Sequence, residues 1–169
     1  QIYINGLAKN IQNDKPIIGN YGVNSEGSGD MYYKGALMLN TIRSTINDDK
    51  KWWNIILEYS NTYKHQIIDS KTVIDFFNQK SGLNLTPIFE QYLKYVNIPM
   101  LELKVENKKL SYRWKTDVAN FEMPVSIEFK NEEKRLQATN EWKTSNFKVK
   151  DIQEINVLRN SFYIDVKIN

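Results

Sequence analysis

The hydrophobic residues of this chain change their spacing near Pro99, and this change constrains the fold more than any other feature of the sequence. From about Asp30 to Val96, apolar residues recur three and four positions apart, as they do on one face of an α-helix. Beyond Pro99, apolar and polar residues alternate, which is typical of half-buried β-strands. We therefore expect a helical part over residues 1–97 and a β part over residues 98–169.

The first clear helix is expected from Asp30 to Ile46, with the Asp30 carboxylate capping the free amides of the first turn. Helical spacing also predicts which residues share one face of this helix. They are Tyr32, Gly35, Ala36, Leu39 and Ile42. Gly35 has no side chain, so we expect another backbone segment to pack close to it.

Three further helices are expected, and their short connections make neighbouring helices antiparallel. The acidic pair Asp48-Asp49 caps the second helix, which has a largely aromatic buried stripe. That stripe is Trp52, Trp53, Ile56, Tyr59 and Tyr63. The third helix begins at Thr72 with capping-box spacing and ends at Gly82, and the fourth carries Pro87 in its first turn, where proline is tolerated.

The remainder of the chain reads as a small antiparallel β-sandwich of about seven short strands. Residues 101–105 and 110–114 flank a polar turn and predict a β-hairpin, with Tyr112 and Trp114 facing the interior. The other expected strands are Met123–Phe129, Arg135–Ala138, Phe147–Val149, Ile155–Leu158 and Phe162–Ile168. The predicted fold class is therefore α+β in two parts, an antiparallel helical segment followed by an immunoglobulin-like sandwich.

The composition excludes most kinds of catalytic or metal site. There are no cysteines, so disulfides and thiolate ligands are excluded. The single histidine, His65, cannot supply the two histidines four residues apart that a helical zinc motif needs. We expect His65 to be solvated at the end of the second helix. The sequence also contains no Gly-x-Ser-x-Gly motif and no phosphate-binding loop, so we predict no metal or cofactor bound by this chain.

Several partner classes are also disfavoured. The net charge is +3 and the lysines are spread along the chain, which does not favour nucleic-acid binding. No apolar run is long enough to span a membrane. The aromatic groups Trp52-Trp53 and Tyr92–Tyr95 could form a stacking platform, but their helical spacing favours a place in the core. The chain begins at Gln1, from which we expect a trimmed or processed piece, and nothing indicates a compartment.

Several segments, in order, carry a resemblance to a known family. Residues 32–36, Tyr-Tyr-Lys-Gly-Ala, resemble the Tyr-x-Lys-Gly-Ala sequence of the aminopeptidase N family of zinc metallopeptidases (gluzincins, peptidase family M-one). Residues 72–85 resemble its Thr-x-x-Asp-Phe…Ser-Gly-x-Asp-Leu passage, with Asn84 where an aspartate is usual. Residues 89–93 are similar to its Phe-x-Gln-Trp-Leu. The likeness spans roughly residues 15–169.

The resemblance implies the fold and the chemistry of a longer parent enzyme. Residues 110–114 and 121–125 resemble strands of the family's sandwich, so the chain would be the C-terminal part of a thermolysin-like catalytic lobe with that sandwich behind it. In the family, two histidines and a glutamate upstream hold zinc. Tyr32 then corresponds to the tyrosine whose hydroxyl stabilises the oxyanion of peptide hydrolysis, and Tyr33 takes a variable position.

The same resemblance implies partners. The parent would act on the N-terminal residues of peptides with zinc as its cofactor, whereas this chain alone would be inactive. The remainder of the catalytic domain would cover a face of the helical part, and that face could cause self-association when it is bare. Two alternatives stay open, a stand-alone binding or scaffold module with a self-contained helical half, and a degenerate, non-catalytic member of the family.

Overall fold

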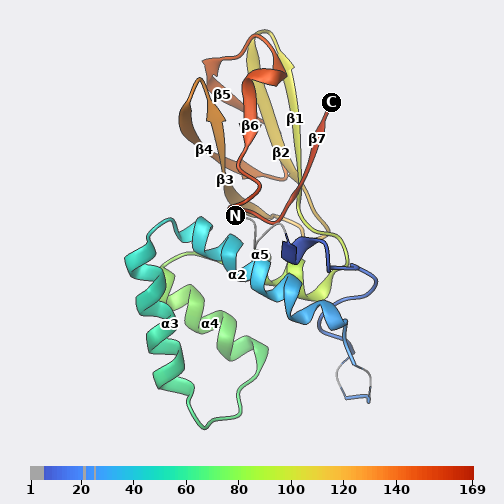
Figure 1. Ribbon diagram of the computed structural model, residues 1–169, viewed down its shortest axis with the longest axis vertical. Coiled ribbons are helices and arrows are strands. Elements are labelled where there is room, and N and C mark those ends of the chain that lie inside the picture. The colour runs from blue at the N-terminus through green and yellow to red at the C-terminus, as the bar shows by residue number, and fades with distance from the viewer. Residues whose placement is uncertain (1–5, 21, 25) are drawn as a thin grey trace.

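A computed structural model describes residues 6–20, 22–24 and 26–169. Helices occupy one end of the molecule and a β-sandwich the other, and the longest axis passes through both (Figure 1). The chain changes from helix to strand between Lys94 and Met100. The two-part α+β architecture predicted from the change of hydrophobic period is confirmed.

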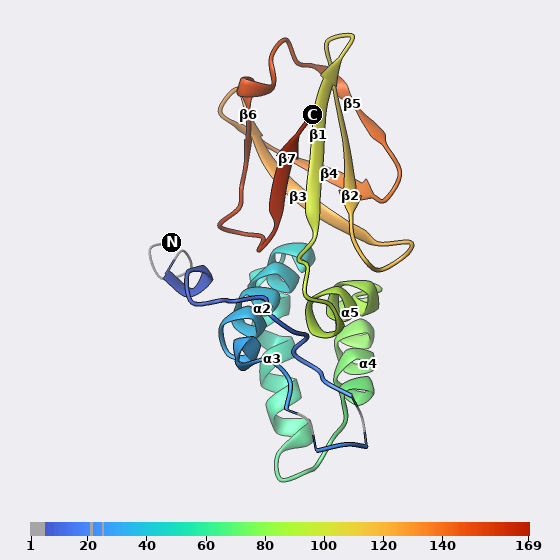
Figure 2. The same ribbon diagram turned by 90° about the vertical axis from the view of Figure 1, so that its right-hand side faces the viewer.

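Residues 6–8 are helical, and after the loop that follows them come a short 3-10 helix and α-helices of 9 to 15 residues. The elements are η1 (Gly29–Met31), α2 (Tyr33–Ile46), α3 (Asp49–Tyr63), α4 (Ser70–Ser81) and α5 (Thr86–Lys94). Helices α2 and α5 lie next to the sandwich, and α3 and α4 extend away from it (Figure 2). Each of these four α-helices packs against two others: α2 and α4 each contact both α3 and α5.

Local signals explain where the helices begin and end. The Asp48 carboxylate accepts the amide of Lys51 at 2.9 Å and caps α3, as predicted. Helix α4 begins at Ser70 rather than Thr72, because the carboxylate of Asp69 accepts the amide of Thr72 at 2.7 Å. Its end at Gly82 is confirmed, and this residue has a φ of 71°, which glycine adopts without steric cost.

Of the residues expected to share one face of α2, Ile42 is buried and Leu39 packs against the core, but Tyr32 and Ala36 are exposed. Asp30 does not cap α2. Asp30 lies in η1, whose cap is the side chain of Ser28. The residues of α2 that are buried are Lys34, Leu37, Met38, Thr41, Ile42 and Thr45. The predicted stripe of α3 also needs correction, since Trp52 is buried but Trp53 is 58% exposed.

The sandwich consists of two sheets with the strand orders β5-β2-β1-β7 and β4-β3-β6. Its strands are β1 (Met100–Glu106), β2 (Lys109–Lys115), β3 (Glu122–Phe129), β4 (Glu132–Thr139), β5 (Lys143–Lys148), β6 (Ile155–Val157) and β7 (Asp165–Ile168). The predicted hairpin is β1 and β2, paired antiparallel. The antiparallel prediction is right except for β7, which pairs parallel with β1 at the edge of its sheet.

One hydrophobic core continues from the helices into the sandwich. Tyr92 of α5 is fully buried, and Trp114 of β2 is buried between the sheets as expected. The indole of Trp114 donates a hydrogen bond of 2.7 Å to the carbonyl of Met123, which satisfies its only polar group. The two parts therefore share buried surface and are packed against each other.

Candidate functional site

Tyr32 lies between η1 and α2, and its side chain is 73% exposed. Its backbone already belongs to the helix, because the carbonyl of Tyr32 accepts the amide of Ala36 at 3.0 Å. The neighbouring Tyr33 is 40% exposed. The site predicted from the sequence therefore presents a free phenol at the N-terminal end of α2.

Exposed apolar side chains lie at the start of α2 and on α3, and Arg43, near the end of α2, contacts one of those on α3. Tyr32 and Ala36 are exposed and lie one turn apart on the same side of the helix as Arg43. The Arg43 guanidinium sits 5.6 Å from the ring centre of Trp53 on α3. Leu57, one turn further along α3, is 61% exposed. We call the surface formed by Tyr32, Ala36, Trp53 and Leu57 the α2–α3 face.

Asp30, two residues before Tyr32, is buried with only 4% of its surface exposed. Its carboxylate accepts the amide of Gln12 at 3.0 Å and the amide of Asn13 at 2.7 Å. These bonds hold the segment before the glycine-rich loop against η1. Sequence reasoning assigned this carboxylate to a helix cap, whereas it joins two distant parts of the chain.

Lys34, two residues after Tyr32, is 1% exposed. Its ammonium donates hydrogen bonds to the carbonyls of Tyr95, at 3.1 Å, and Val96, at 2.9 Å. Those carbonyls follow the last turn of α5, where helices leave carbonyl groups without partners. Burial lowers the pKa of Lys34, while the negative charges of Asp30 and Asp117 act in the opposite direction.

The loop that leads to η1 is closed by a tight backbone approach at Gly27. A Cβ atom on Gly27 would lie 1.7 Å from the carbonyl oxygen of Ile17, so only glycine fits without movement of the chain. The next amide, of Ser28, donates to the carbonyl of Pro16 at 2.9 Å. By contrast, a Cβ on Gly35 would meet no atom within 4 Å, so the expected close backbone neighbour is absent from the described residues.

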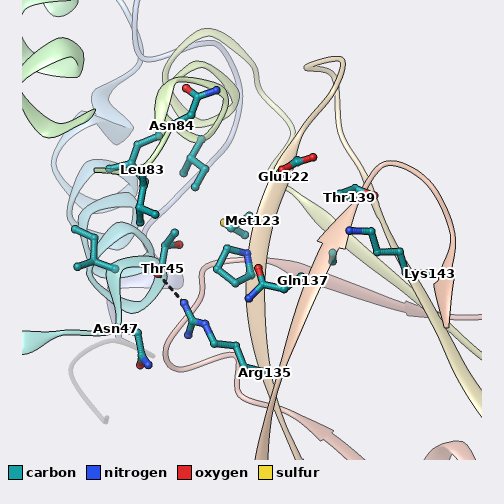
Figure 3. Close-up of a pocket in the computed structure, with 15 residues that line it drawn as sticks. Thr45, Asn47, Leu83, Asn84, Glu122, Met123, Arg135, Gln137, Thr139 and Lys143 are labelled. Atoms are coloured by element: carbon teal, nitrogen blue, oxygen red, sulfur yellow. Dashed lines mark hydrogen bonds between the residues drawn. The ribbon is translucent and has the colours of Figure 1, made fainter. Parts of the chain in front are cut away.

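A hollow of about 440 Å³ lies between the end of α2 and the sandwich. Arg135 reaches into it from β4 and donates to the carbonyl of Thr45 at 2.6 Å (Figure 3). It also donates to the carbonyl of Ser44, at 3.0 Å. Burial lowers the pKa of Arg135, and the charge of Glu133 opposes this. Because the guanidinium is hydrogen-bonded to the last turn of α2, the hollow lies where the helical part contacts the sandwich. It is at the opposite end of α2 from Tyr32.

The described residues do not fit a zinc ion. Protein zinc sites need three or four histidine, cysteine or carboxylate ligands. In residues 6–20, 22–24 and 26–169, no group of three or more such side chains could hold a metal. His65 is exposed and stands alone just beyond the end of α3. Among the helices within those ranges, none has the length and apolar character to cross a membrane.

Comparison with solved structures finds a similar fold in a peptidase. The crystal structure of Legionella pneumophila aminopeptidase A in complex with aspartic acid matches with a TM-score of 0.66 and 16% sequence identity. The chain shares its fold with part of that aminopeptidase. The match covers 84% of this chain but only 18% of the Legionella chain. No model of a known protein family matches the sequence, and a search of curated proteins finds no match.

Sequence reasoning singled out Tyr32 but did not predict that Asp30 and Lys34 beside it are buried. Lys34 could have been found, because it shares the helical face of Leu37, Met38 and Thr41, where a lysine is unusual. Asp30 could not, since its partners Gln12 and Asn13 are far away in the sequence and no periodicity connects them.

Proposed function

We propose that this chain is the C-terminal portion of a zinc-dependent aminopeptidase and supplies the tyrosine that stabilises the oxyanion of the reaction. The observation that carries the proposal is the state of Tyr32, whose side chain is open to solvent on a backbone held by hydrogen bonds on both sides. The fold shared with an aminopeptidase and the Tyr-x-Lys-Gly-Ala segment support the same reading.

A phenol suits this role because it remains a hydrogen-bond donor in neutral water. When water attacks a peptide carbonyl, negative charge develops on the carbonyl oxygen. A donor held in place beforehand stabilises that charge without reorganising during the reaction. Tyr32 is the donor in this proposal, and adjacent helical residues point about 100° apart, so Tyr33 faces elsewhere.

The zinc ion and its ligands belong to a part of the enzyme outside this chain. The described residues contain no ligand set for it. The α2–α3 face, bare in this structure, is where the remainder of the catalytic domain would pack in this proposal. A helix face with Tyr32, Trp53 and Leu57 exposed is an apolar surface of the kind that marks a contact with another protein surface.

The sandwich has a supporting role in this proposal. Its core is continuous with that of the helices, and Arg135 of β4 holds the last turn of α2. Tyr32 is at the start of that same helix. In this proposal the sandwich therefore supports the helix that carries the site.

Reconstitution tests this function. The chain should be assayed for hydrolysis of an aminoacyl-anilide, alone and joined to a preceding segment that carries His-Glu-x-x-His. We expect no hydrolysis and no stoichiometric zinc for the chain alone, and both for the joined protein. A joined protein that binds zinc and contains a folded chain, yet hydrolyses no N-terminal residue, contradicts the proposal.

A binding or scaffold module is the second candidate function. It is favoured by the single core that links helices and sandwich, which makes the chain look like one packed unit. This alternative expects a stable monomer whose α2–α3 face binds no further part of the same protein. The two candidates therefore differ in what covers that face.

A further inference from the structure

We propose that Asp30 and Lys34 are positioning residues that fix the phenol of Tyr32 for its role in hydrolysis; this inference rests on the proposed function. Both side chains are buried and carry charge, and they stand two residues before and two residues after the exposed tyrosine. Neither points to solvent, so each acts through the backbone that carries Tyr32.

The first reason is that buried charges are rare in this molecule. Among the described residues, the charged side chains that are buried are Asp30, Lys34 and Glu102. Two of these three flank Tyr32. Removing a charged group from water is costly unless its hydrogen bonds are made within the protein. Because both lie within two residues of the exposed Tyr32, we infer that their cost is offset by a role in holding this part of the backbone.

The second reason is that hydrogen bonds anchor Asp30 and Lys34 to two different parts of the chain. Asp30 is held by the amides of Gln12 and Asn13, in the segment before the glycine-rich loop. Lys34 is held by carbonyls beyond the end of α5. Two residues along a helix differ by about 200° around its axis, so Lys34 points into the protein when Tyr32 points out. The backbone between the anchors can neither slide along the helix axis nor turn freely around it.

The third reason is that one anchor continues into the sandwich. Asn13, which donates its amide to Asp30, also donates from its side chain to the phenol oxygen of Tyr163 at 3.2 Å. Asn13 has a φ of 50°, a left-handed conformation that this pair of contacts helps to maintain. The start of α2 is thus tied to the segment that leads into β7, as well as to α5.

A double-mutant cycle tests the inference in the complete zinc-containing enzyme. Lys34→Met keeps the length of the side chain and removes its donors, and Asp30→Asn keeps the shape and removes the charge. Each is measured with Tyr32 present and in a Tyr32→Phe background. We expect kcat to fall roughly 10- to 100-fold when Tyr32 is present, because small misplacements of a catalytic group have effects of this size. In the Tyr32→Phe background we expect less than about a twofold change.

The kinetic pattern separates positioning from loss of structure. KM should change little, and zinc content should stay at that of the parent, because neither residue touches the substrate or the metal in this proposal. Glu102→Gln is the matched control, since Glu102 is the other buried charge and lies in the sandwich. It should lower stability without changing kcat.

A measurement on the chain itself does not depend on activity. The amide of Ala36 bonds to the carbonyl of Tyr32, so its hydrogen exchange reports on the first turn of α2. In Lys34→Met this amide should exchange at least tenfold faster while the amides in the middle of α3 stay unchanged. Equal exchange at Ala36 in the variant and the parent contradicts the anchoring.

The outcomes distinguish this inference from the proposed function. If Tyr32→Phe leaves kcat unchanged, the proposed function fails, and the positioning role fails with it. If Tyr32→Phe lowers kcat but Lys34→Met and Asp30→Asn have equal effects with and without the hydroxyl, only the positioning inference is overturned. Effects that disappear with the hydroxyl support it.

Discussion

The phenol of Tyr92 donates a hydrogen bond of 2.5 Å to the main-chain oxygen of Tyr163, and this bond joins α5 to the segment before β7. The two rings are stacked with their centres 6.3 Å apart. The amide of Tyr163 donates in turn to the hydroxyl of Thr41 on α2, at 2.9 Å. Two helices of the helical part are therefore bound to the sandwich through polar groups inside the core.

Tyr92→Phe should change how the free energy of unfolding depends on pH above about pH 9. Burial raises the pKa of Tyr92 well above the ordinary value of 10.0. The unfolded chain ionises this phenol near pH 10 and the folded chain does not, so its contribution is full below about pH 10 and is lost as the pH rises. We expect the variant to be less stable by about 1 kcal/mol at pH 7, from the lost hydrogen bond, and to lose less stability between about pH 9 and 11.

Denaturant unfolding at several pH values checks this prediction. Tyr33→Phe is the control, since Tyr33 is partly exposed and should leave both the neutral and the alkaline values unchanged. If Tyr92→Phe and the parent lose stability in parallel above pH 10, the buried phenol is not responsible for the alkaline limb.

Glu102→Gln should act at the acid side. A hydrogen bond of 2.7 Å from Arg113 holds the pKa of Glu102 below its ordinary value of 4.5, and the charges of Arg113 and Lys167 add to this effect. The contribution is therefore present above about pH 4.5 and is lost as the pH falls through the lowered pKa. We expect the variant to be less stable than the parent at pH 7 and the two to converge towards pH 2 to 3, as measured by urea unfolding. A constant difference across that range contradicts the assignment.

Two glycine substitutions should have opposite effects on stability. Gly27→Ala places a Cβ against the carbonyl of Ile17, and we expect a loss of about 1–3 kcal/mol because the loop must move. Gly35→Ala meets no atom within 4 Å and lies in α2, so a gain of up to about 1 kcal/mol is expected. Thermal unfolding of the chain measures both. A destabilised Gly35→Ala variant would show that a neighbour is close to that position after all.

The α2–α3 face should cause association of the isolated chain. Leu57 and Trp53 are exposed apolar side chains on adjacent turns of α3. We expect the sedimentation coefficient to rise with protein concentration, and Leu57→Lys to reduce this rise. Ile168→Lys is the matched control, because Ile168 is equally exposed but lies in β7 of the sandwich. Equal effects of the two lysines would show that the association is not specific to the α2–α3 face.

Periodicity predicted the order of helices and strands because it depends on neighbours in the sequence. Residues 101–105 and 110–114 form β1 and β2 as expected, since alternation directly reports the two faces of a strand. The same reasoning failed for α2. Its apolar residues do not lie on one side only, and a buried lysine and two buried threonines replace the apolar stripe that the method looks for.

The anchoring of the candidate site was beyond sequence reasoning. The partners of Asp30 and Lys34 lie at Gln12, Asn13, Tyr95 and Val96, and nothing local in the chain specifies those contacts. The parallel pairing of β7 with β1 is also a long-range choice that strand patterns cannot distinguish from an antiparallel one. The division into domains at residues 97 and 98, and the role of Tyr32, stay predictions.

The turnover number of Tyr32→Phe in the complete zinc-containing enzyme tests the central claim most directly. If Tyr32 donates to the oxyanion, kcat falls about 100- to 1000-fold, zinc content is unchanged, and Tyr33→Phe in the same protein keeps near-parental turnover. A Tyr32→Phe enzyme whose kcat stays within about twofold of the parent contradicts the account.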